Sequence, residues 1–180
     1  MADRFYADDF KPDFGCPYPT YTDAELALRS DEELSAMAEG RAICEMNGKI
    51  DPIQFGWTLE SWRKCMEDWF EYHIHVICGG NRSGKSSYAA SLVVHAAMSI
   101  PEAKIRCYHV NSAKSIAEQQ AMVWAALPER FKKMGKKKGQ NYSIQYSQKN
   151  GFTSSKLILP PMPGFERGSE ILFCDYQQYK

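Results

Sequence analysis

The residues best suited to chemistry lie in one stretch, Gly79-Gly80-Asn81-Arg82-Ser83-Gly84-Lys85-Ser86. Its spacing fits G-x-x-x-x-G-K-[ST], the Walker A loop that holds nucleotide phosphates. Gly79 and Gly84 lack a Cβ, so the backbone can curl and point its N–H groups at an anion. Lys85 would contact the β- and γ-phosphates, and Ser86 would bind Mg²⁺. The alternative is a glycine-rich turn before a helix, but the placed lysine and serine favour the phosphate loop.

The flanking sequence predicts the two elements that must position such a loop. Residues 73–78 (His-Ile-His-Val-Ile-Cys) are typical of a short buried strand, and residues 86–98 of a helix. Strand, glycine loop and helix in this order are the context that the motif requires. The helix would add a partial positive charge at its N-terminus. We therefore expect ATP and Mg²⁺ to bind through residues 79–87, Ser87 included.

The order of elements after the loop predicts an α/β fold. Lys104–Val110 has the composition of a strand, and Asn111-Ser112 caps a helix over 113–127 that Pro128 ends. This β-α-β-α order predicts a parallel sheet with right-handed crossovers. Further strands are expected at residues 142–147, 156–159 and 170–174. Asn150-Gly151 is a hairpin signal between the first two of these.

The N-terminal part differs in character, and we divide the chain into an arm or helical region (1–50) and a P-loop domain (51–180). Residues 1–21 carry aromatic residues and prolines without periodicity, which indicates an irregular arm. Thr22-Asp23-Ala24-Glu25 is a capping box that predicts a helix to about Glu39, with Gly40 as its stop. A second helix over 59–72 carries an apolar stripe that is either core packing or a shelf for adenine. The stripe consists of Leu59, Trp62, Met66, Trp69 and Phe70.

Composition excludes several classes of protein. The chain has 180 residues, of which 44% are hydrophobic and 13% aromatic, so a disordered chain is excluded and one domain is expected. No apolar run approaches the ~20 residues that span a bilayer, and the N-terminus lacks the apolar core of a signal peptide. Six cysteines occur without a C-x-x-C pair, so we expect them to be reduced and mostly buried. Neither their spacing nor a histidine cluster indicates zinc.

The formal net charge is zero, but the charge is unevenly distributed. Residues 1–72 hold 16 acidic and 7 basic residues, whereas residues 73–180 hold 6 acidic and 15 basic residues. This asymmetry indicates either a basic face for polyanions beside an acidic arm, or two halves that attract each other. A lysine run would contact DNA phosphates or form a solvated loop. The run is Lys132, Lys133, Lys136, Lys137 and Lys138.

Gly80–Ser86 resembles the Walker A loop of phage terminase large subunits, the ATPases that pump DNA into virus capsids. Later features are similar in order: Gln119-Gln120 in a polar helix, Leu127-Pro128, Gly168–Phe173, and Tyr176-Gln177-Gln178. The resemblance covers residues 55–180. It implies a P-loop NTPase of the additional-strand class, with a parallel sheet flanked by helices, incomplete at its C-terminal end, and a helical N-terminal arm.

The resemblance also assigns roles to single residues. Residues 79–86 would hold the triphosphate, with Lys85 on the β- and γ-phosphates and Ser86 on Mg²⁺. Arg82 stands where the family often keeps an arginine that senses or stabilises the γ-phosphate. We therefore take Lys85 and Arg82 as the catalytic candidates. The family's adenine-binding glutamine has no match, because Gln54 lies too early and Trp62-Arg63 occupies the corresponding place.

A nucleotide hydrolase also needs a strand that ends in Asp and Glu. Ile171–Asp175 supplies the apolar run and the acid, but Tyr176 stands where Glu is needed. The residues alone leave Asp175 as a possible Mg²⁺ ligand, whereas the resemblance places this strand just upstream of the true Walker B. Whole members of the family continue with Walker B, a coupling motif and a nuclease domain. We therefore expect the chain to be the N-terminal part of a packaging ATPase that alone hydrolyses ATP very slowly or not at all.

The resemblance further implies partners and a place of action. These are double-stranded DNA, the terminase small subunit, the portal protein and a homo-oligomeric ring in the host cell cytoplasm, without a membrane. Unpaired strand edges would favour self-association or a larger parent. Two alternatives stay open: another P-loop enzyme such as a small-molecule kinase, or an adaptor whose acidic N-terminal region docks packaging partners. Salt-sensitive binding to duplex DNA would separate the first alternative from the motor.

Overall fold

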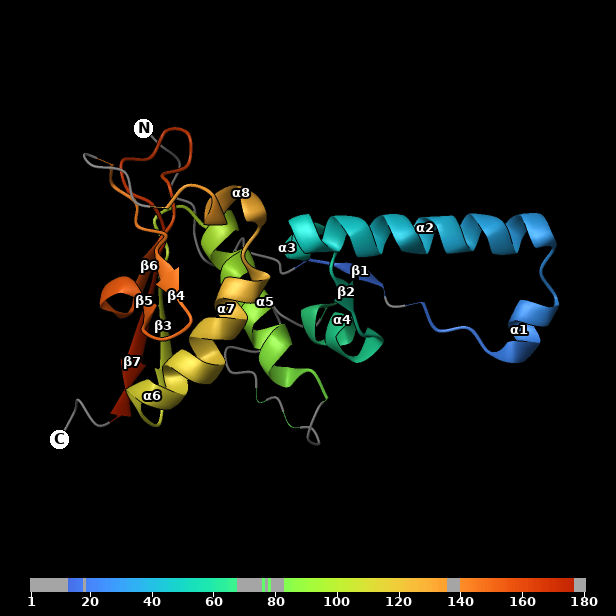
Figure 1. Cartoon of the computed structure of the whole chain (residues 1–180), viewed down its shortest axis with the longest axis horizontal. Coiled ribbons are helices and arrows are strands. Elements are labelled where there is room, and N and C mark those ends of the chain that lie inside the picture. The colour runs from blue at the N-terminus through green and yellow to red at the C-terminus, as the bar shows by residue number, and fades with distance from the viewer. Residues whose placement is uncertain are drawn as a thin grey trace.

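The computed structural model describes residues 13–17, 19–67, 76, 78, 83–135 and 140–176. Figure 1 shows a body of helices and strands, from which a long helix extends to one side. The described elements mix α-helices with short β-sheets, which confirms the α/β class at a coarse level. The described sheets are short and do not clearly form the parallel P-loop sheet that we expected.

The main sheet has three strands in the order β3-β7-β6. β3 (Lys104–His109) and β7 (Glu170–Asp175) run parallel, in a register from Lys104 opposite Glu170 to His109 opposite Asp175. β6 (Lys156–Ile158) pairs with β7 in the antiparallel sense. The sheet is therefore mixed, whereas we expected only parallel strands. Residues 159–169 join β6 to β7 without a helix, and a connection without a crossover helix suits antiparallel neighbours.

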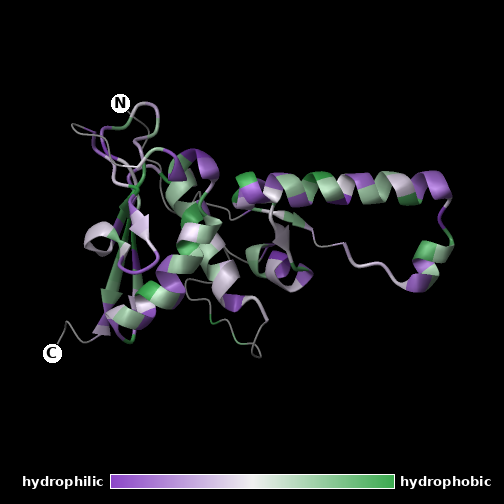
Figure 2. Cartoon of the chain, viewed as in Figure 1, coloured by the Kyte–Doolittle hydropathy of each residue, from purple (hydrophilic) through white to green (hydrophobic). Residues whose placement is uncertain are grey.

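Helices cover the sheet on the side where its apolar residues gather. α5 (Lys85–Ser99) contacts β3, β7 and α7 (Ala121–Ala126). Figure 2 shows hydrophobic residues on β7 and along parts of α5 and α7. The centre of this core is fully excluded from solvent, as expected for burial that drives folding. It includes Val94, Leu127, Leu157 and Ile171, each 0% exposed.

The helix predicted over 113–127 is present but divided. α6 (Ser112–Lys114) leads into a π-helical turn, η2 (Ser115–Gln120), and then into α7. The turn positions Gln120, which is 1% exposed. Its Oε1 accepts a hydrogen bond from the Phe152 N–H at 2.8 Å, and its Nε2 donates to Ser115 Oγ at 3.4 Å. Polar pairing inside the core thus replaces the regular helix that the sequence predicted.

The predicted hairpin forms at the expected turn but with different strands. β4 (Tyr146–Ser147) pairs with β5 (Gly151–Phe152), not with residues 156–159. η3 (Thr153–Ser155) then turns the chain so that β6 reaches β7. Gly151 has φ +69°, and a Cβ there would collide with the Gln120 side chain. Only one bridge, Ser143 to Ile158, joins the two segments that we expected to pair.

The N-terminal helix is two helices and extends further than predicted. α1 (Asp23–Ala27) ends early, and α2 (Asp31–Ile50) starts at a second capping box, Ser30 with Glu33. α2 runs through Gly40, the predicted stop, without a break. A single glycine costs a helix only about 1 kcal/mol relative to alanine, which does not end it. None of the residues of α2 is buried.

Short elements join this helical arm to the body. α3 (Pro52–Phe55) contacts α2 and α5, and α8 (Glu129–Lys132) also contacts α2. β1 (Cys16–Pro17) and β2 (Trp57–Thr58) form a small parallel pair, followed by α4 (Glu60–Glu67). α2 ends at Ile50, where we placed the boundary of the P-loop domain. The division into domains stays a prediction.

The cysteines are free, but they are not mostly buried as we expected. Cys107 and Cys174 are buried, Cys78 is exposed, and the other three are half-buried. Burial, with a smaller contribution from Cys174, raises the pKa of Cys107 to about 11. Within the described residues, no helix is both long and apolar enough to cross a membrane.

Candidate functional site

The described part of the predicted phosphate loop begins at Ser83 and turns at Gly84. Gly84 has φ +80° and ψ 6°, a left-handed conformation that favours glycine over other residues. Its carbonyl oxygen accepts the Tyr88 N–H at 2.9 Å, the first hydrogen bond of α5. Residues 79–82, including the predicted γ-phosphate sensor Arg82, lie outside the described residues. The described end of the predicted loop therefore turns at a left-handed glycine.

The start of α5 has no side-chain cap and no acidic residue in its first turn. The start of α2 has both, a capping box and three acidic residues. The first N–H groups of any helix lack partners within the helix, and the helix dipole adds positive charge there. An anion from outside the chain would satisfy these donors at the start of α5.

Lys85 and the two serines that follow it have different surroundings. Lys85 Nζ donates to Ser83 Oγ at 3.2 Å, which keeps the ammonium group beside the turn. Ser86 is exposed in the first turn of α5. Ser87 Oγ donates to Met122 Sδ at 3.7 Å, so it is directed at α7. Lys85 and Ser86 are thus the described side chains best placed for a phosphate and its metal ion.

One wall of the site is an aromatic pair from two helices. Trp62 of α4 stacks on Tyr88 of α5, with ring centroids 4.9 Å apart and planes at 16°. Both side chains are buried, and so is Met66, whereas Leu59 is 42% exposed. Burial raises the pKa of Tyr88 to about 12, so its phenol stays neutral near pH 7. Core packing therefore accounts for Trp62 and Met66, and the other two members of the apolar stripe, Trp69 and Phe70, lie outside the described residues.

The strand predicted before the loop is mostly beyond what the structure describes. Val76 and Cys78 are its two described residues, and both are exposed and outside any strand. Val76 is 81% exposed, which differs from the buried strand that we expected. A strand needs a neighbour to satisfy its backbone groups, and the three strands of the main sheet do not pair with these two residues.

The carboxyl ends of β3 and β7 bring a second set of polar residues together. His109 and Asp175 are neighbours in register, and Asp175 is buried. His109 Nε2 lies 3.5 Å from Glu118 Oε2. In Figure 1 the arrowhead of β7 and the start of α5 lie toward the same side of the body. Searching the described residues finds no group of three or more His, Cys, Asp or Glu side chains that could hold a metal ion.

Comparison with known proteins adds nothing to this geometry. The chain matches no family model, no curated protein and no solved structure. The site must therefore be judged from its own residues.

Other residues that the motif analysis singled out support the fold. Ser169 Oγ donates to the Ile100 carbonyl at 2.8 Å and accepts the Ala103 N–H at 3.2 Å, which fixes the turn after α5. A Cβ on Gly168 would collide with the Leu159 carbonyl oxygen. Gln119 Nε2 donates to the Tyr108 carbonyl at 3.3 Å. These contacts hold α5, η2 and the sheet together without touching the described loop residues.

The lysine run is only partly described. Lys132 Nζ lies 3.0 Å from Glu129 Oε1 and 5.7 Å from the centre of the Trp124 ring, and its side chain is 15% exposed. Lys133 is exposed, and Lys136, Lys137 and Lys138 lie outside the described residues. Lys133 is therefore the described member of the run that faces solvent, while Lys132 is held by its neighbours.

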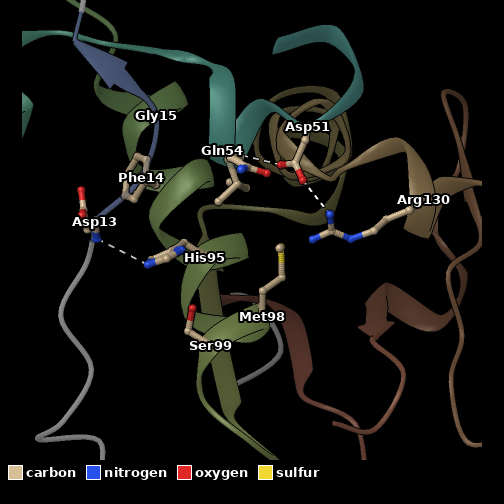
Figure 3. Close-up of a pocket in the computed structure, with 10 residues that line it drawn as sticks. Asp13, Phe14, Gly15, Asp51, Gln54, His95, Met98, Ser99 and Arg130 are labelled. Atoms are coloured by element: carbon tan, nitrogen blue, oxygen red, sulfur yellow. Dashed lines mark hydrogen bonds and ion pairs between the residues drawn. The ribbon is translucent and has the colours of Figure 1, made fainter. Parts of the chain in front are cut away.

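Sequence reasoning missed a cavity of about 400 Å³ near the other end of α5. Figure 3 shows His95 and Met98 projecting from α5 between Phe14 and Arg130. Arg130 Nη1 contacts Asp51 Oδ2 at 2.7 Å, and the Gln54 N–H donates to Asp51 Oδ1 at 3.1 Å. Its lining comes from four segments that are distant in sequence, so no motif could have indicated it. The α5 residues that line this cavity begin at His95, ten residues after Lys85, which corresponds to about 15 Å along the helix at 1.5 Å per residue. Gln54 lines the same cavity, at this other end of α5.

Proposed function

We propose that this chain binds ATP with Mg²⁺ at Ser83–Ser86 and is the N-terminal part of the ATPase domain of a viral terminase large subunit. The observation that carries the proposal is the start of α5. A left-handed Gly84 leads into a helix that has no cap of its own, with Lys85 folded back beside the turn. These are the features that a phosphate chain requires of its binding loop.

In this proposal, the described residues would bind either the phosphates or the Mg²⁺ ion. The N–H groups at the start of α5 and the Lys85 ammonium would hold the β- and γ-phosphates. The exposed Ser86 hydroxyl would bind Mg²⁺, which neutralises phosphate charge when it is bound. The parallel pair β3 and β7 supports the same interpretation, because ligands of α/β sheets bind beyond the carboxyl ends of such strands.

The larger role rests on the resemblance of residues 55–180 to the terminase family. In that role ATP hydrolysis would power the movement of double-stranded DNA into a procapsid, with the small subunit and the portal as partners. The parent would act as a homo-oligomeric ring in the host cytoplasm. Lys133 is the described member of the lysine run that is exposed for a DNA phosphate.

The test is nucleotide binding by Lys85→Ala. Calorimetry with a slowly hydrolysed ATP analogue and Mg²⁺ should show binding by the natural chain, and at least about tenfold weaker binding by the variant. The loss follows from removing a hydrogen bond to a charged group. Lys149→Ala removes an exposed lysine at the β4–β5 turn and should bind as the natural chain does. Equal affinity of all three proteins would refute the phosphate site.

The exposed surface of α2 favours a second candidate function, in which the N-terminal region acts as an adaptor that docks packaging partners. Ile43, Met46 and Ile50 are 50%, 61% and 56% exposed, and their spacing places them on one face of the helix. Apolar residues at this spacing are typical of a helix that docks in a partner's groove. The first turn of α2 carries three acidic residues, Asp31, Glu32 and Glu33, in keeping with the acidic character of residues 1–72.

This candidate predicts that charge on the exposed apolar face prevents docking. The double variant Ile43→Asp/Met46→Asp should bind purified small subunit or portal protein of the same virus at least about tenfold more weakly. Burying a carboxylate in an apolar groove is the physical reason. Ala38→Asp adds a charge at another exposed position of α2 and should leave binding unchanged. Binding by the double variant at natural strength would exclude this face as the docking site.

A further inference from the structure

Two buried side-chain nitrogen atoms in the described part of the chain have no hydrogen-bond partner, Trp62 Nε1 and His109 Nδ1. The two differ in chemistry. A neutral imidazole can leave one nitrogen without a proton, whereas an indole N–H is always a donor and accepts nothing. A buried donor without an acceptor is unfavourable and rare in folded proteins. Trp62 is therefore the one of the two that must find an acceptor.

The position of the indole directs this donor at the candidate phosphate loop. Trp62 is 9% exposed, and its ring plane is fixed by the stack on Tyr88. A Cβ built on Gly84 would lie 3.4 Å from Nε1, its nearest contact. Nε1 thus lies close to Gly84, a residue without a side chain. Gly84 directly precedes Lys85, the residue at which α5 begins without a side-chain cap.

These observations rest on different atoms. The missing cap and the left-handed glycine are backbone features of α5, whereas the unpaired N–H belongs to a side chain of α4. The first N–H groups of α5 and the Trp62 N–H therefore lie at the same turn. An acceptor with several oxygen atoms would satisfy both, and a phosphate chain is such a group.

We infer that Trp62 is a further binding residue of this site, whose indole N–H donates to an oxygen of the bound phosphate chain. The inference rests on the proposed nucleotide site. We considered two roles for the apolar stripe, core packing and a shelf for adenine. In the inferred arrangement the face of the Trp62 ring packs on Tyr88 in the core, and its N–H edge contacts the ligand. Trp62 recognises phosphate in this arrangement and does not stack on adenine.

Trp62→Phe tests the inference, because phenylalanine keeps a ring against Tyr88 and removes only the N–H edge. Magnesium tripolyphosphate, which has no base, and the Mg²⁺ complex of an ATP analogue are the two probes. We expect both to bind about tenfold more weakly to the variant. The melting temperature without ligand should stay the same or rise, since no native hydrogen bond is lost. Trp124→Phe, which changes a tryptophan stacked on Tyr146 away from the loop, should bind both probes normally.

The natural chain gives an independent signal that does not depend on a variant folding. It has four tryptophans, hence four indole N–H resonances in an ¹⁵N-labelled sample. The Trp62 resonance, assigned through its own side chain, should move downfield when tripolyphosphate and Mg²⁺ are added, as a hydrogen bond forms. Its exchange with solvent should slow in the same titration.

The outcomes separate this inference from the proposed function. If binding depends on Lys85 but Trp62→Phe binds both probes normally, the inference is wrong and the nucleotide site stands. If only the ATP analogue binds more weakly, Trp62 recognises the base and the inference is also wrong. If the indole resonance moves without a change in affinity, its acceptor is a loop carbonyl, which again overturns it. If the natural chain binds neither probe, the inference and the proposed function fail together.

Discussion

α2 and α5 are the two long helices of the described chain, and they are stabilised in opposite ways. α2 has 20 residues and none is buried, whereas α5 has 15 residues and buries Tyr88, Ala90, Val94 and Ala97. α2 starts at a capping box and carries an Arg41–Glu45 ion pair at 2.8 Å. α5 starts without a side-chain cap. Local interactions therefore support α2, and packing against the rest of the body supports α5.

This difference between α2 and α5 concerns the N–H groups at the start of each helix. Packing holds α5 firmly enough that its first turn does not need a cap for stability. Beside this turn, the Trp62 N–H has no hydrogen-bond partner. Packing of an apolar face is the usual main source of helix stability in proteins, and α2 has no buried residue to provide it. Its N-cap is occupied by the Ser30 and Glu33 capping box, and its exposed apolar residues include Ile43 and Met46.

The largest effect expected from this comparison is on global stability. Val94→Ala in α5 should lower the free energy of unfolding by about 2 kcal/mol, because it removes buried methyl groups and leaves a cavity. Ile43→Ala in α2 should change it by less than about 0.5 kcal/mol, because the side chain is half exposed. Thermal or urea unfolding of both variants measures the difference. Equal losses would mean that α2 packs on the body far more than its exposure indicates.

Sequence patterns predicted the elements whose local signals agree with their packing. The helix after the loop, the strand at Lys104 and the strand at Glu170 lie within one or two residues of the predicted bounds. The αL turn of Gly84 was also predictable, because the motif requires glycine there. In the N-terminal region, Ser30-Asp31-Glu32-Glu33 is a second capping box that a count of S-x-x-E patterns would have found. The predicted stop at Gly40 is wrong, because α2 continues through this glycine.

Features that depend on distant contacts could not be predicted in the same way. The π-turn of η2 exists because Gln120 reaches the Phe152 N–H, a partner 32 residues away. β6 pairs with β7 instead of continuing the hairpin, and alternation in sequence does not specify which edge a strand joins. The Trp62 N–H was also missed, because its spacing on α4 indicates only an apolar face. Its importance depends on Gly84, which is 22 positions later in the chain.

The smallest expected effect is local, at the first turns of α1 and α2. Ser30 Oγ accepts the Glu33 N–H at 3.3 Å, and Glu33 Oε2 accepts the Ser30 N–H at 2.9 Å. Ser30→Ala should weaken the start of α2 by about 1 kcal/mol. Hydrogen exchange of the first-turn amides should become faster there, with no change in α5. Ser35→Ala, an exposed position inside α2, is the control and should leave exchange unchanged.

Acid should act on the same caps. Backbone hydrogen bonds from Ser30 and Thr22 hold the pKa values of Glu33 and Glu25 below their ordinary value of 4.5. A lowered pKa in the folded state means that the carboxylate stabilises the fold above 4.5, and that this contribution is lost as pH falls through the folded pKa. Helix signal from α1 and α2 should therefore persist to about pH 4.5 and decline below it. Glu33→Gln keeps the reach back to the Ser30 N–H but does not titrate, so it should reduce the decline. A decline of the same size in Glu33→Gln would show that the Glu33 carboxylate is not the group whose protonation weakens α2.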